Sequence, residues 1–325
     1  MMPSDVRETI NQAIAQHTYG EQPAELYEPI RYIMALGGKR LRPTLTLMAY
    51  QLFREPSTDP AVLNPALAVE VFHNFTLMHD DIMDEAPLRR GKPTVHEQWN
   101  RNVAILSGDV MLVKAYELLM HTPTSQLPDV LTAFNHCATE VCEGQQWDMN
   151  YETASEVSEA DYLRMIRQKT AVLLGFGLQL GGLLAEADPA TVGLLYELGI
   201  NIGIGFQLKD DLLDVYADQA AFGKQPGGDI IANKKTYLLI KALENARDEQ
   251  HVQLVDWISR PSFDKTEKVA AVKAIYDQLG IGALTETTMN QYFQRGLEQL
   301  QRVQADEARK QELRSFIEPL IHREK

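Results

Sequence analysis

The sequence has few cysteines and no excess of basic residues, and both deficits narrow its possible functions. Only Cys137 and Cys142 are cysteines, which is too few for a disulfide framework, and their spacing is not that of a zinc site. We expect both to be core residues of a protein in the reducing cytoplasm. Acidic residues outnumber basic ones by 45 to 31, for a formal net charge of −14. The chain therefore lacks the overall basic field that favours a nucleic acid partner.

Long hydrophobic runs are also missing. The longest apolar stretch, residues 171–187, is interrupted by Gln179 and four glycines. It falls short of the ~20 apolar residues that a membrane span needs. The first residues are polar and have no apolar segment like that of a signal peptide. We therefore expect no transmembrane segment and no export, and we predict that 171–187 forms a helix buried in protein.

Strand patterns are scarce, whereas helical periodicity runs through almost the whole chain. No run of alternating β-branched residues lies between turn signals. The turn signals that recur are too short to be interdomain linkers, so the sequence predicts one all-α domain over residues 1–325. Residues 301–325 read as a charged amphipathic helix on the solvated surface.

Two aspartate-rich motifs of the same form stand in opposite halves of the chain, Asp80-Asp81-Ile82-Met83-Asp84 and Asp210-Asp211-Leu212-Leu213-Asp214. On a helix, the first and fifth residues of such a motif lie within about 40° of each other. Crowded carboxylates repel unless a cation screens them. Mg²⁺ prefers oxygen ligands and often combines one or two carboxylates with substrate phosphates. The two motifs therefore suggest a diphosphate held through Mg²⁺ from both sides.

Further polar residues follow the helical spacing of these motifs. His73 lies seven residues before Asp80, close to two whole turns, so we expect it on the same helix face. Gln207 precedes Asp210 by three residues and repeats the arrangement in the second motif.

Basic residues cluster in two short segments, and such cations suit diphosphate oxygens. The first is Gly37-Gly38-Lys39-Arg40-Leu41-Arg42-Pro43, where Gly37-Gly38 also marks the end of the preceding helix. The second, residues 87–94, follows the first acidic motif and contains Arg89, Arg90 and Lys92; its Pro and Gly content predicts a mobile loop.

Together these segments resemble the trans-type isoprenyl diphosphate synthases, or polyprenyl synthetases. The resemblance spans most of the chain and rests on four motifs in the family's order: residues 37–43, Asp80 to Asp84 with Arg89-Arg90-Gly91, Lys169-Thr170, and Gln207 with Asp210 to Asp214. It implies an isoprenoid synthase fold, which is a large antiparallel helical bundle around a central cavity, and a homodimer. It also implies a cytoplasmic, Mg²⁺-dependent prenyltransferase that condenses isopentenyl diphosphate with dimethylallyl, geranyl or farnesyl diphosphate.

The resemblance also implies roles for individual residues. Three Mg²⁺ ions would bind Asp80, Asp84 and Asp210, with Asp81, Asp211 and Asp214 completing or supporting the shell. Residues that contact the allylic diphosphate would be Arg89, Lys169 and Lys224. Those that hold isopentenyl diphosphate would be Lys39, Arg42, His73 and Arg90. The developing carbocation would be faced by Lys169, Thr170 and Gln207. One more substrate-binding lysine of the family corresponds to Lys234, with Lys235 as the alternative.

Product length follows from the same resemblance. In the family, bulky residues shortly before the first acidic motif form the floor of the elongation pocket, and here these are Phe75 and Thr76. An aromatic residue at that position resembles short-chain synthases that make C20 products, with C15 next.

Two other functions remain as alternatives. Terpene cyclases share the helical fold and one aspartate-rich motif, but they generally lack the second motif and the cluster around Lys39 and Arg42. Regulatory subunits of heteromeric synthases typically lack intact acidic motifs, and both motifs are intact here.

Overall fold

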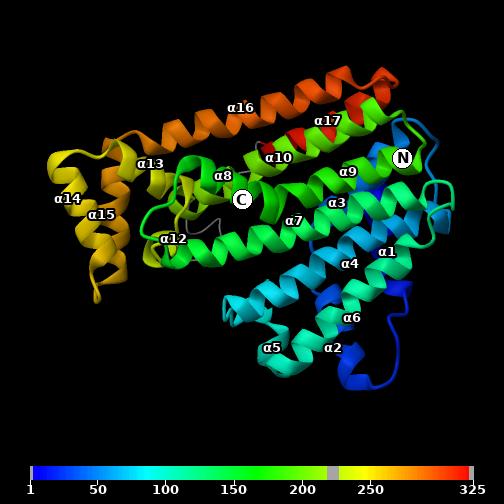
Figure 1. Ribbon diagram of the computed structural model, residues 1–325, viewed down its shortest axis with the longest axis horizontal. Coiled ribbons are helices and arrows are strands. Elements are labelled where there is room, and N and C mark those ends of the chain that lie inside the picture. The colour runs from blue at the N-terminus through cyan, green and yellow to red at the C-terminus, as the bar shows by residue number, and fades with distance from the viewer. Residues whose placement is uncertain (1–2, 218–226, 322–325) are drawn as a thin grey trace. The chain divides into compact units, whose positions relative to one another are not determined.

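The computed structural model describes residues 3–217 and 227–321 (Figure 1). These residues divide into two compact units, each assembled from separate stretches of the chain. Unit 1 takes its described residues from Met1–Ala138, Leu173–Gly199 and Leu300–Phe316. Unit 2 takes its described residues from Thr139–Val172, Ile200–Gln299 and Ile317–Lys325.

Helices dominate the described residues, as the sequence predicts. In chain order they are α1 (Pro3–Gln16), α2 (Ala24–Ala35), α3 (Leu41–Gln51), α4 (Pro60–Met83), α5 (Val95–Gln98), α6 (Arg101–Leu119), α7 (Leu127–Thr153), α8 (Glu159–Ile166), the π-helical turn η1 (Arg167–Ala171), α9 (Val172–Leu184), α10 (Pro189–Tyr216), α12 (Gly228–Ile231), α13 (Tyr237–Asn245), α14 (Asp248–Ser259), α15 (Lys265–Gln278), α16 (Ile281–Arg302) and α17 (Glu307–Ile321). The strands are β1 (Leu88–Arg89) and β2 (Lys92–Pro93).

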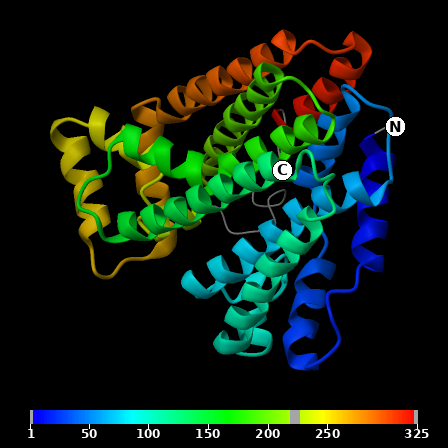
Figure 2. The same ribbon diagram turned by 45° about the vertical axis from the view of Figure 1, so that its right-hand side comes forward.

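Within unit 1, α4 packs along α6, and the two helices lie side by side in both views (Figures 1 and 2). Asp59 caps α4 by accepting a hydrogen bond from Ala61 N at 2.8 Å, and Pro60 fits the first helical turn. Gly108 on α6 permits the close approach, because a Cβ there would stand 2.3 Å from His79 Nε2. This packing fixes the helix that carries the first acidic motif.

The apolar stretch 171–187 forms a buried helix, as predicted. It contributes α9, whose residues Leu174, Phe176 and Leu180 are each at most 2 % exposed. A Cβ on Gly199 of α10 would stand 2.6 Å from the Gly175 backbone, so glycine at this position lets α9 and α10 approach closely within unit 1.

Unit 2 has its own apolar core. The end of α10 packs there with α12, α13, α14, α15 and the start of α16, and the buried residues include Val215, Leu238, Leu254, Val272 and Ile281. The side chain of Asp264 caps α15 by accepting hydrogen bonds from Thr266 N and Glu267 N, both at 2.9 Å. The second acidic motif, at the end of α10, is thereby anchored to a packed core.

Three local predictions needed correction or refinement. Cys137 is buried as expected, but Cys142 is exposed, because it lies on the outer face of α7. Residues 301–325 do not form one helix: α16 ends at Arg302, and Asp306 starts α17 by accepting hydrogen bonds from two backbone N–H groups. A wholly solvated surface helix is also wrong, because Leu313 and Ile317 of α17 are fully buried.

The segment after the first acidic motif is non-helical, as predicted, but it is a β-hairpin. Leu88 pairs with Pro93 and Arg89 pairs with Lys92 in antiparallel register. The two turn residues, Arg90 and Gly91, have φ of 53° and 74°, which is typical of a type I′ turn. The turn fixes where Arg89 and Arg90 leave the backbone.

One described helix, α10, is long and apolar enough to cross a membrane by composition. Of its most apolar window, 61 % is buried inside protein. Core helices of globular proteins pass the same test.

Candidate active site

The first group of predicted site residues meets where α3 begins beside α4 in unit 1. Arg42 Nη1 lies 3.2 Å from His73 Nε2. Burial, followed by the positive charges of Arg42 and Arg90, lowers the pKa of His73 well below its ordinary value. The imidazole is therefore neutral at physiological pH, and Nε2 accepts the hydrogen bond from the Arg42 guanidinium.

Arg40 fixes the turn that leads into α3. It adopts the left-handed conformation with φ 49°, and its guanidinium donates to Glu70 Oε1 and to Met34 O, each at 2.7 Å. Both side chains of the Arg40–Glu70 ion pair are 4 % exposed. A pair buried so completely holds the turn between Lys39 and Arg42 against α4.

Arg90 reaches the same turn from the hairpin. Its guanidinium donates a hydrogen bond to Gly37 O. The Arg90 guanidinium also lies close to Gly38, where a Cβ would stand 2.9 Å from Arg90 Nη1. The residues predicted to hold isopentenyl diphosphate thus gather in one place, with Lys39 exposed at the surface of the turn.

The first acidic motif lies at the C-terminal end of α4, with Asp84 as the C-cap residue. Arg89 grips Asp81 with two hydrogen bonds, Nε to Oδ2 at 2.8 Å and Nη2 to Oδ1 at 2.7 Å. The same guanidinium lies 3.9 Å from Asp80 Oδ2. Asp81 is buried, Asp80 is partly buried and Asp84 is exposed. The middle carboxylate therefore positions Arg89, while Asp84 faces solvent and Asp80 is partly exposed with its Oδ1 buried.

In the second motif, in unit 2, the middle carboxylate is also buried and held by hydrogen bonds from protein groups. Asp211 is buried and accepts hydrogen bonds from Tyr162 Oη, from Gln207 Nε2 at 3.3 Å and from Tyr237 N at 3.4 Å. Burial, with a further contribution from the Asp229 carboxylate, raises the pKa of Asp211 to about 7.

The outer carboxylates of the second motif are less enclosed. Asp210 and Asp214 are each partly buried. Asp214 Oδ2 accepts a hydrogen bond from Asp229 N at 2.9 Å, which ties the end of α10 to α12. In both motifs the first carboxylate thus stays accessible while the second is held by protein.

Lys169 and Thr170 lie in η1, where the helix widens to the π form. π-Helical turns are rare in proteins, and those that occur often lie at functional sites. Lys169 Nζ forms a 2.5 Å ion pair with Asp148 Oδ2. Thr170 Oγ1 donates to Gln207 Oε1 at 3.3 Å, so two residues predicted to face the carbocation are joined directly.

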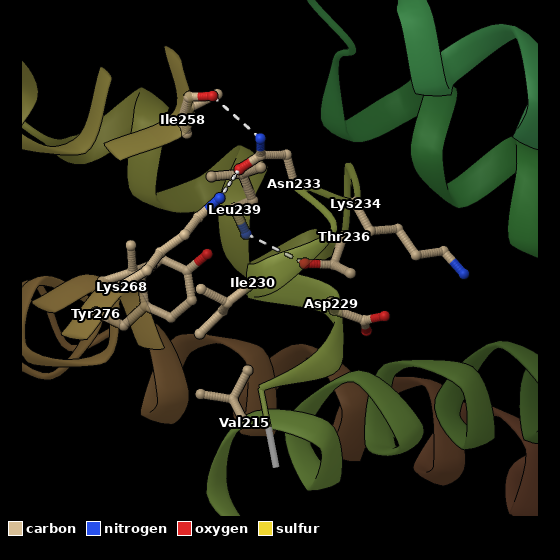
Figure 3. Close-up of a pocket in the computed structure, with 11 residues that line it drawn as sticks. Val215, Asp229, Ile230, Asn233, Lys234, Thr236, Leu239, Ile258, Lys268 and Tyr276 are labelled. Atoms are coloured by element: carbon tan, nitrogen blue, oxygen red, sulfur yellow. Dashed lines mark hydrogen bonds between the residues drawn. The ribbon is translucent and has the colours of Figure 1, made fainter. Parts of the chain in front are cut away.

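Two predicted lysines follow the second motif. Lys224 lies outside the described residues. Lys234 is exposed beside a small pocket, and its backbone N–H donates to Asp229 O at 2.9 Å (Figure 3). Lys235 is partly buried, so exposure favours Lys234 of the two.

The predicted floor residues lie one helical turn and more before Asp80. Phe75 is 8 % exposed, and its ring packs on Phe72 at 5.5 Å and edge-on against His79 at 4.8 Å. Thr76 Oγ1 donates to His73 O at 2.8 Å, so its hydroxyl is satisfied by its own helix.

The donor chemistry of both motifs fits Mg²⁺. Asp80, Asp84 and Asp210 present carboxylate oxygens that solvent can reach, and such hard oxygen ligands are those Mg²⁺ prefers. Within residues 3–217 and 227–321, no three or more His, Cys, Asp or Glu side chains form a ready-made metal cluster. Mg²⁺ usually takes only one or two carboxylates from protein and keeps water or phosphate ligands.

Comparison with known proteins decides the family. The family model described as Polyprenyl synthetase matches residues 23–279. This chain is a polyprenyl synthetase. It is 35 % identical to the geranylfarnesyl diphosphate synthase of Natronomonas pharaonis over 98 % of this chain and 95 % of that one. A crystal structure of a geranylgeranyl pyrophosphate synthase superposes with a TM-score of 0.94, at 41 % identity and full coverage of both chains.

A further polyprenyl synthase, from Caulobacter crescentus, was crystallised with calcium and isoprenyl diphosphate. It has a TM-score of 0.84 and 26 % identity, covering 99 % of this chain and 94 % of that one. The polyprenyl synthetase described here is accordingly an enzyme, a trans-prenyltransferase, with the predicted all-α isoprenoid synthase fold. Neither a terpene cyclase nor a regulatory subunit is favoured by these relatives.

Some residues that shape the synthetase site were missed from sequence. They are Glu70, which pairs with Arg40 of the basic cluster, Tyr162 beside Asp211, and Asp148 beside Lys169. Glu70 had a signal, since it is the one charged residue in the apolar stretch 61–72. Tyr162 and Asp148 had none, because each is far in sequence from its partner.

Proposed function

We propose that this synthetase condenses isopentenyl diphosphate with dimethylallyl, geranyl or farnesyl diphosphate to give an all-trans prenyl diphosphate of C20 or, as the next candidate, C15. One observation carries the proposal. Arg42 and Arg90 contact neutral acceptors, the His73 imidazole and the Gly37 carbonyl, whereas Arg89 is neutralised by Asp81. The carboxylate that acts on both Arg42 and Arg90 is Glu70, which is already ion-paired with Arg40. This cluster of unit 1 therefore keeps a net positive charge for one diphosphate, apart from the acidic motif that suits a metal-bound second one.

In this proposal the two substrates use different residues. Isopentenyl diphosphate is held by Lys39, Arg42, His73 and Arg90. The allylic diphosphate is contacted by Arg89, Lys169 and Lys234, and by Lys224 outside the described residues. Because guanidinium and ammonium groups bind diphosphate oxygens through charge-assisted hydrogen bonds, each set orients its ligand before reaction.

Three Mg²⁺ ions complete the proposed site. Asp80, Asp84 and Asp210 would ligate them, with Asp81, Asp211 and Asp214 in support. Bound Mg²⁺ would neutralise the charge that builds on a departing diphosphate. Asp81 contributes by holding Arg89, and Asp211 by holding Gln207 through its hydrogen bond of 3.3 Å.

The reaction then balances without another reactant. The allylic C–O bond breaks, and the diphosphate leaves with the electron pair. The double bond of isopentenyl diphosphate forms the new C–C bond to the allylic cation, and a proton is lost to the released diphosphate. Thr170 and Gln207, linked at 3.3 Å, offer oxygen dipoles that stabilise the cation.

We also propose that units 1 and 2 belong to one synthase domain over residues 1–325, because a single family model spans residues of both. A cytoplasmic location is part of this proposal. Both cysteines are free thiols, which suits a reducing compartment.

The proposed function has a direct test. The purified protein is incubated with isopentenyl diphosphate, an allylic primer and Mg²⁺, and the dephosphorylated products are separated by chromatography. We expect linear C20 product with consumption of isopentenyl diphosphate. A cyclic product formed without that consumption would indicate a cyclase, and no product would indicate a subunit that needs a partner.

A homodimer is proposed from an apolar stripe on α6 and its C-cap residue, Met120. Leu106, Val113 and Met120 are 58 %, 56 % and 59 % exposed and are spaced by seven residues, so they share one face. Exposed apolar side chains in such a row are typical of an interaction surface. A second copy of this chain is the occupant that we propose.

The Leu106→Glu, Val113→Glu double variant is therefore expected to be monomeric, because two buried carboxylates without partners would oppose association. Light scattering after size-exclusion chromatography measures the mass. Val252→Glu is the matched control, since Val252 is 66 % exposed on α14 and is not part of the stripe. A double variant that still elutes as a dimer would place the interface elsewhere.

Product length is expected to change in Phe75→Ala. If the Phe75 ring closes the pocket, its removal opens room for at least one more C5 unit. Each added unit then gains roughly 25 cal/mol per Å² of apolar surface buried, so elongation continues until another side chain blocks it. Chromatography should show products longer than C20 at a similar initial rate.

Phe72→Leu is the control for this experiment, because Phe72 is equally buried and packs on Phe75. It should lose stability and keep the wild-type product. If Phe75→Ala also keeps that product, another residue sets the length.

A further inference from the structure

Lys268, on α15 in unit 2, is a lysine whose side chain is fully buried. Its Nζ donates to Asn233 Oδ1 at 2.6 Å and to Ile231 O at 3.4 Å, and it lies 4.0 Å from the centre of the Phe263 ring. All three contacts are to neutral groups. Burial lowers the pKa of this ammonium. Lysine is rarely buried without a carboxylate because its desolvation is costly, so the contact with Asn233 invites a functional explanation.

Asn233 connects α15 to two other elements. Its Nδ2 donates to Ile258 O, near the end of α14, at 3.0 Å, while its Oδ1 receives the Lys268 hydrogen bond (Figure 3). Asn233 follows α12 with φ 54°, the left-handed conformation that often ends a helix. The side chain thus clamps this turn between α14 and α15.

The residue directly after the clamp is Lys234. Its N–H is fixed by Asp229 O at 2.9 Å, and its own carbonyl accepts from Thr236 N at 2.8 Å. Thr236 in turn caps α13 by accepting from Leu239 N. The backbone of Lys234 is therefore restrained on both sides, whereas its side chain extends away from Lys268 and is exposed (Figure 3).

A purely structural role explains the clamp poorly. A buried amine is more costly than an apolar side chain of similar length, and replacing buried charges by apolar residues is often neutral or stabilising. Methionine at position 268 would fill the same space among Val272, Leu239 and Ile230. The specific effect of the amine is to fix Asn233 and the turn that carries Lys234.

We propose that Lys268 and Asn233 are positioning residues that hold Lys234 for contact with the allylic diphosphate. The inference rests on the role proposed above for Lys234. Neither residue touches substrate. The clamp sets the direction in which Lys234 leaves the turn, and a small misplacement of a substrate-binding group is enough to weaken binding strongly.

The test compares four single variants and one double variant. Lys268→Met removes the amine and keeps the length, and Asn233→Gly removes the clamp while tolerating the positive φ. Lys234→Gln removes the group that is positioned. Val272→Ala is the matched control, since Val272 lines the same pocket and takes no part in the hydrogen bonds of Asn233 and Lys268. Thermal unfolding and steady-state kinetics are measured for each, with the two substrates varied in turn.

We expect Lys268→Met and Asn233→Gly to raise the KM for the allylic diphosphate about tenfold, with the KM for isopentenyl diphosphate nearly unchanged. Val272→Ala should lower Tm to a similar extent or more and leave both KM values as in wild type. In the Lys234→Gln background, adding Lys268→Met should have no further kinetic effect, because two residues that act through one contact are not additive.

Three results would overturn the inference: an unchanged allylic KM in both clamp variants, a full additional loss in Lys234→Gln, Lys268→Met, or equal changes for the two substrates. If Lys234→Gln itself behaves like wild type, Lys234 has no role and nothing is positioned. The condensation activity of the wild-type protein is measured in the same experiment. If the wild-type protein has no such activity, the proposed function has failed, and this outcome is distinct from failure of the positioning inference. If Lys268→Met does not fold, Asn233→Gly decides the outcome alone.

Discussion

Replacing Asp80 or Asp210 by asparagine is expected to lower kcat about 10³-fold, or about 4 kcal/mol of transition-state stabilisation, while the protein stays folded. Asparagine keeps the shape of the side chain and removes the charge that a divalent cation needs. Both residues are the solvent-accessible first carboxylates of their motifs. Loss of either carboxylate should therefore slow the departure of the diphosphate directly.

The measurement is kcat as a function of Mg²⁺ concentration, with circular dichroism to confirm folding. The variants should also need more Mg²⁺ for half-maximal rate. Asp129→Asn is the control, since Asp129 is exposed on α7 outside both motifs, and it should behave like wild type. Near-normal turnover in a folded Asp80 or Asp210 variant would remove that carboxylate from the proposed metal site.

Arg42→Ala is expected to raise the KM for isopentenyl diphosphate about 100-fold and to change the KM for the allylic substrate little. The Arg42 guanidinium is partly buried against the neutral His73 imidazole, so its charge is available to a dianionic ligand. Removing it deletes a charge-assisted contact in a site of low polarity, where such contacts are strong.

Arg42→Lys provides the matched comparison, because it keeps the charge and loses the fork that contacts both His73 and a ligand. It should recover part of the affinity. Steady-state kinetics with each substrate varied in turn separates the effects. If Arg42→Ala raised both KM values equally, Arg42 would not belong to one substrate alone.

Local spacing carried the sequence predictions that succeeded. The i, i+4 relation of Asp80 and Asp84 placed them at the end of one helix, and the closing bond from Asp84 N to Asp80 O at 2.8 Å agrees with that. The Pro and Gly content of residues 87–94 likewise predicted a non-helical segment, and this segment is the hairpin of β1 and β2. Such features depend on a few consecutive residues, which is why the sequence alone reveals them.

Features that depend on distant residues stayed hidden. The hydrogen bond from Tyr162 to Asp211 joins residues 49 apart, and the Lys169–Asp148 pair joins residues 21 apart. Nothing near Lys169 predicts the π-helical turn. Cys142 was predicted to be a core residue because cysteine is usually buried, but it lies on a solvent-exposed face of α7. These outcomes depend on which faces meet, and single-sequence patterns do not determine that.

The bidentate ion pair between Arg89 and Asp81 affects how the affinity for each substrate depends on ionic strength. Arg89 already carries an internal counter-ion, and so does Lys169 in Asp148. In the proposed assignment, an allylic diphosphate that binds either group would take the place of a protein carboxylate, so few dissolved anions would need to be released. Isopentenyl diphosphate is proposed to bind Arg42 and Arg90, whose hydrogen-bond partners are neutral, and it would therefore displace mobile anions from solution. Its binding should therefore weaken more steeply as ionic strength rises, which makes the cell's salt content a control on which substrate limits the rate.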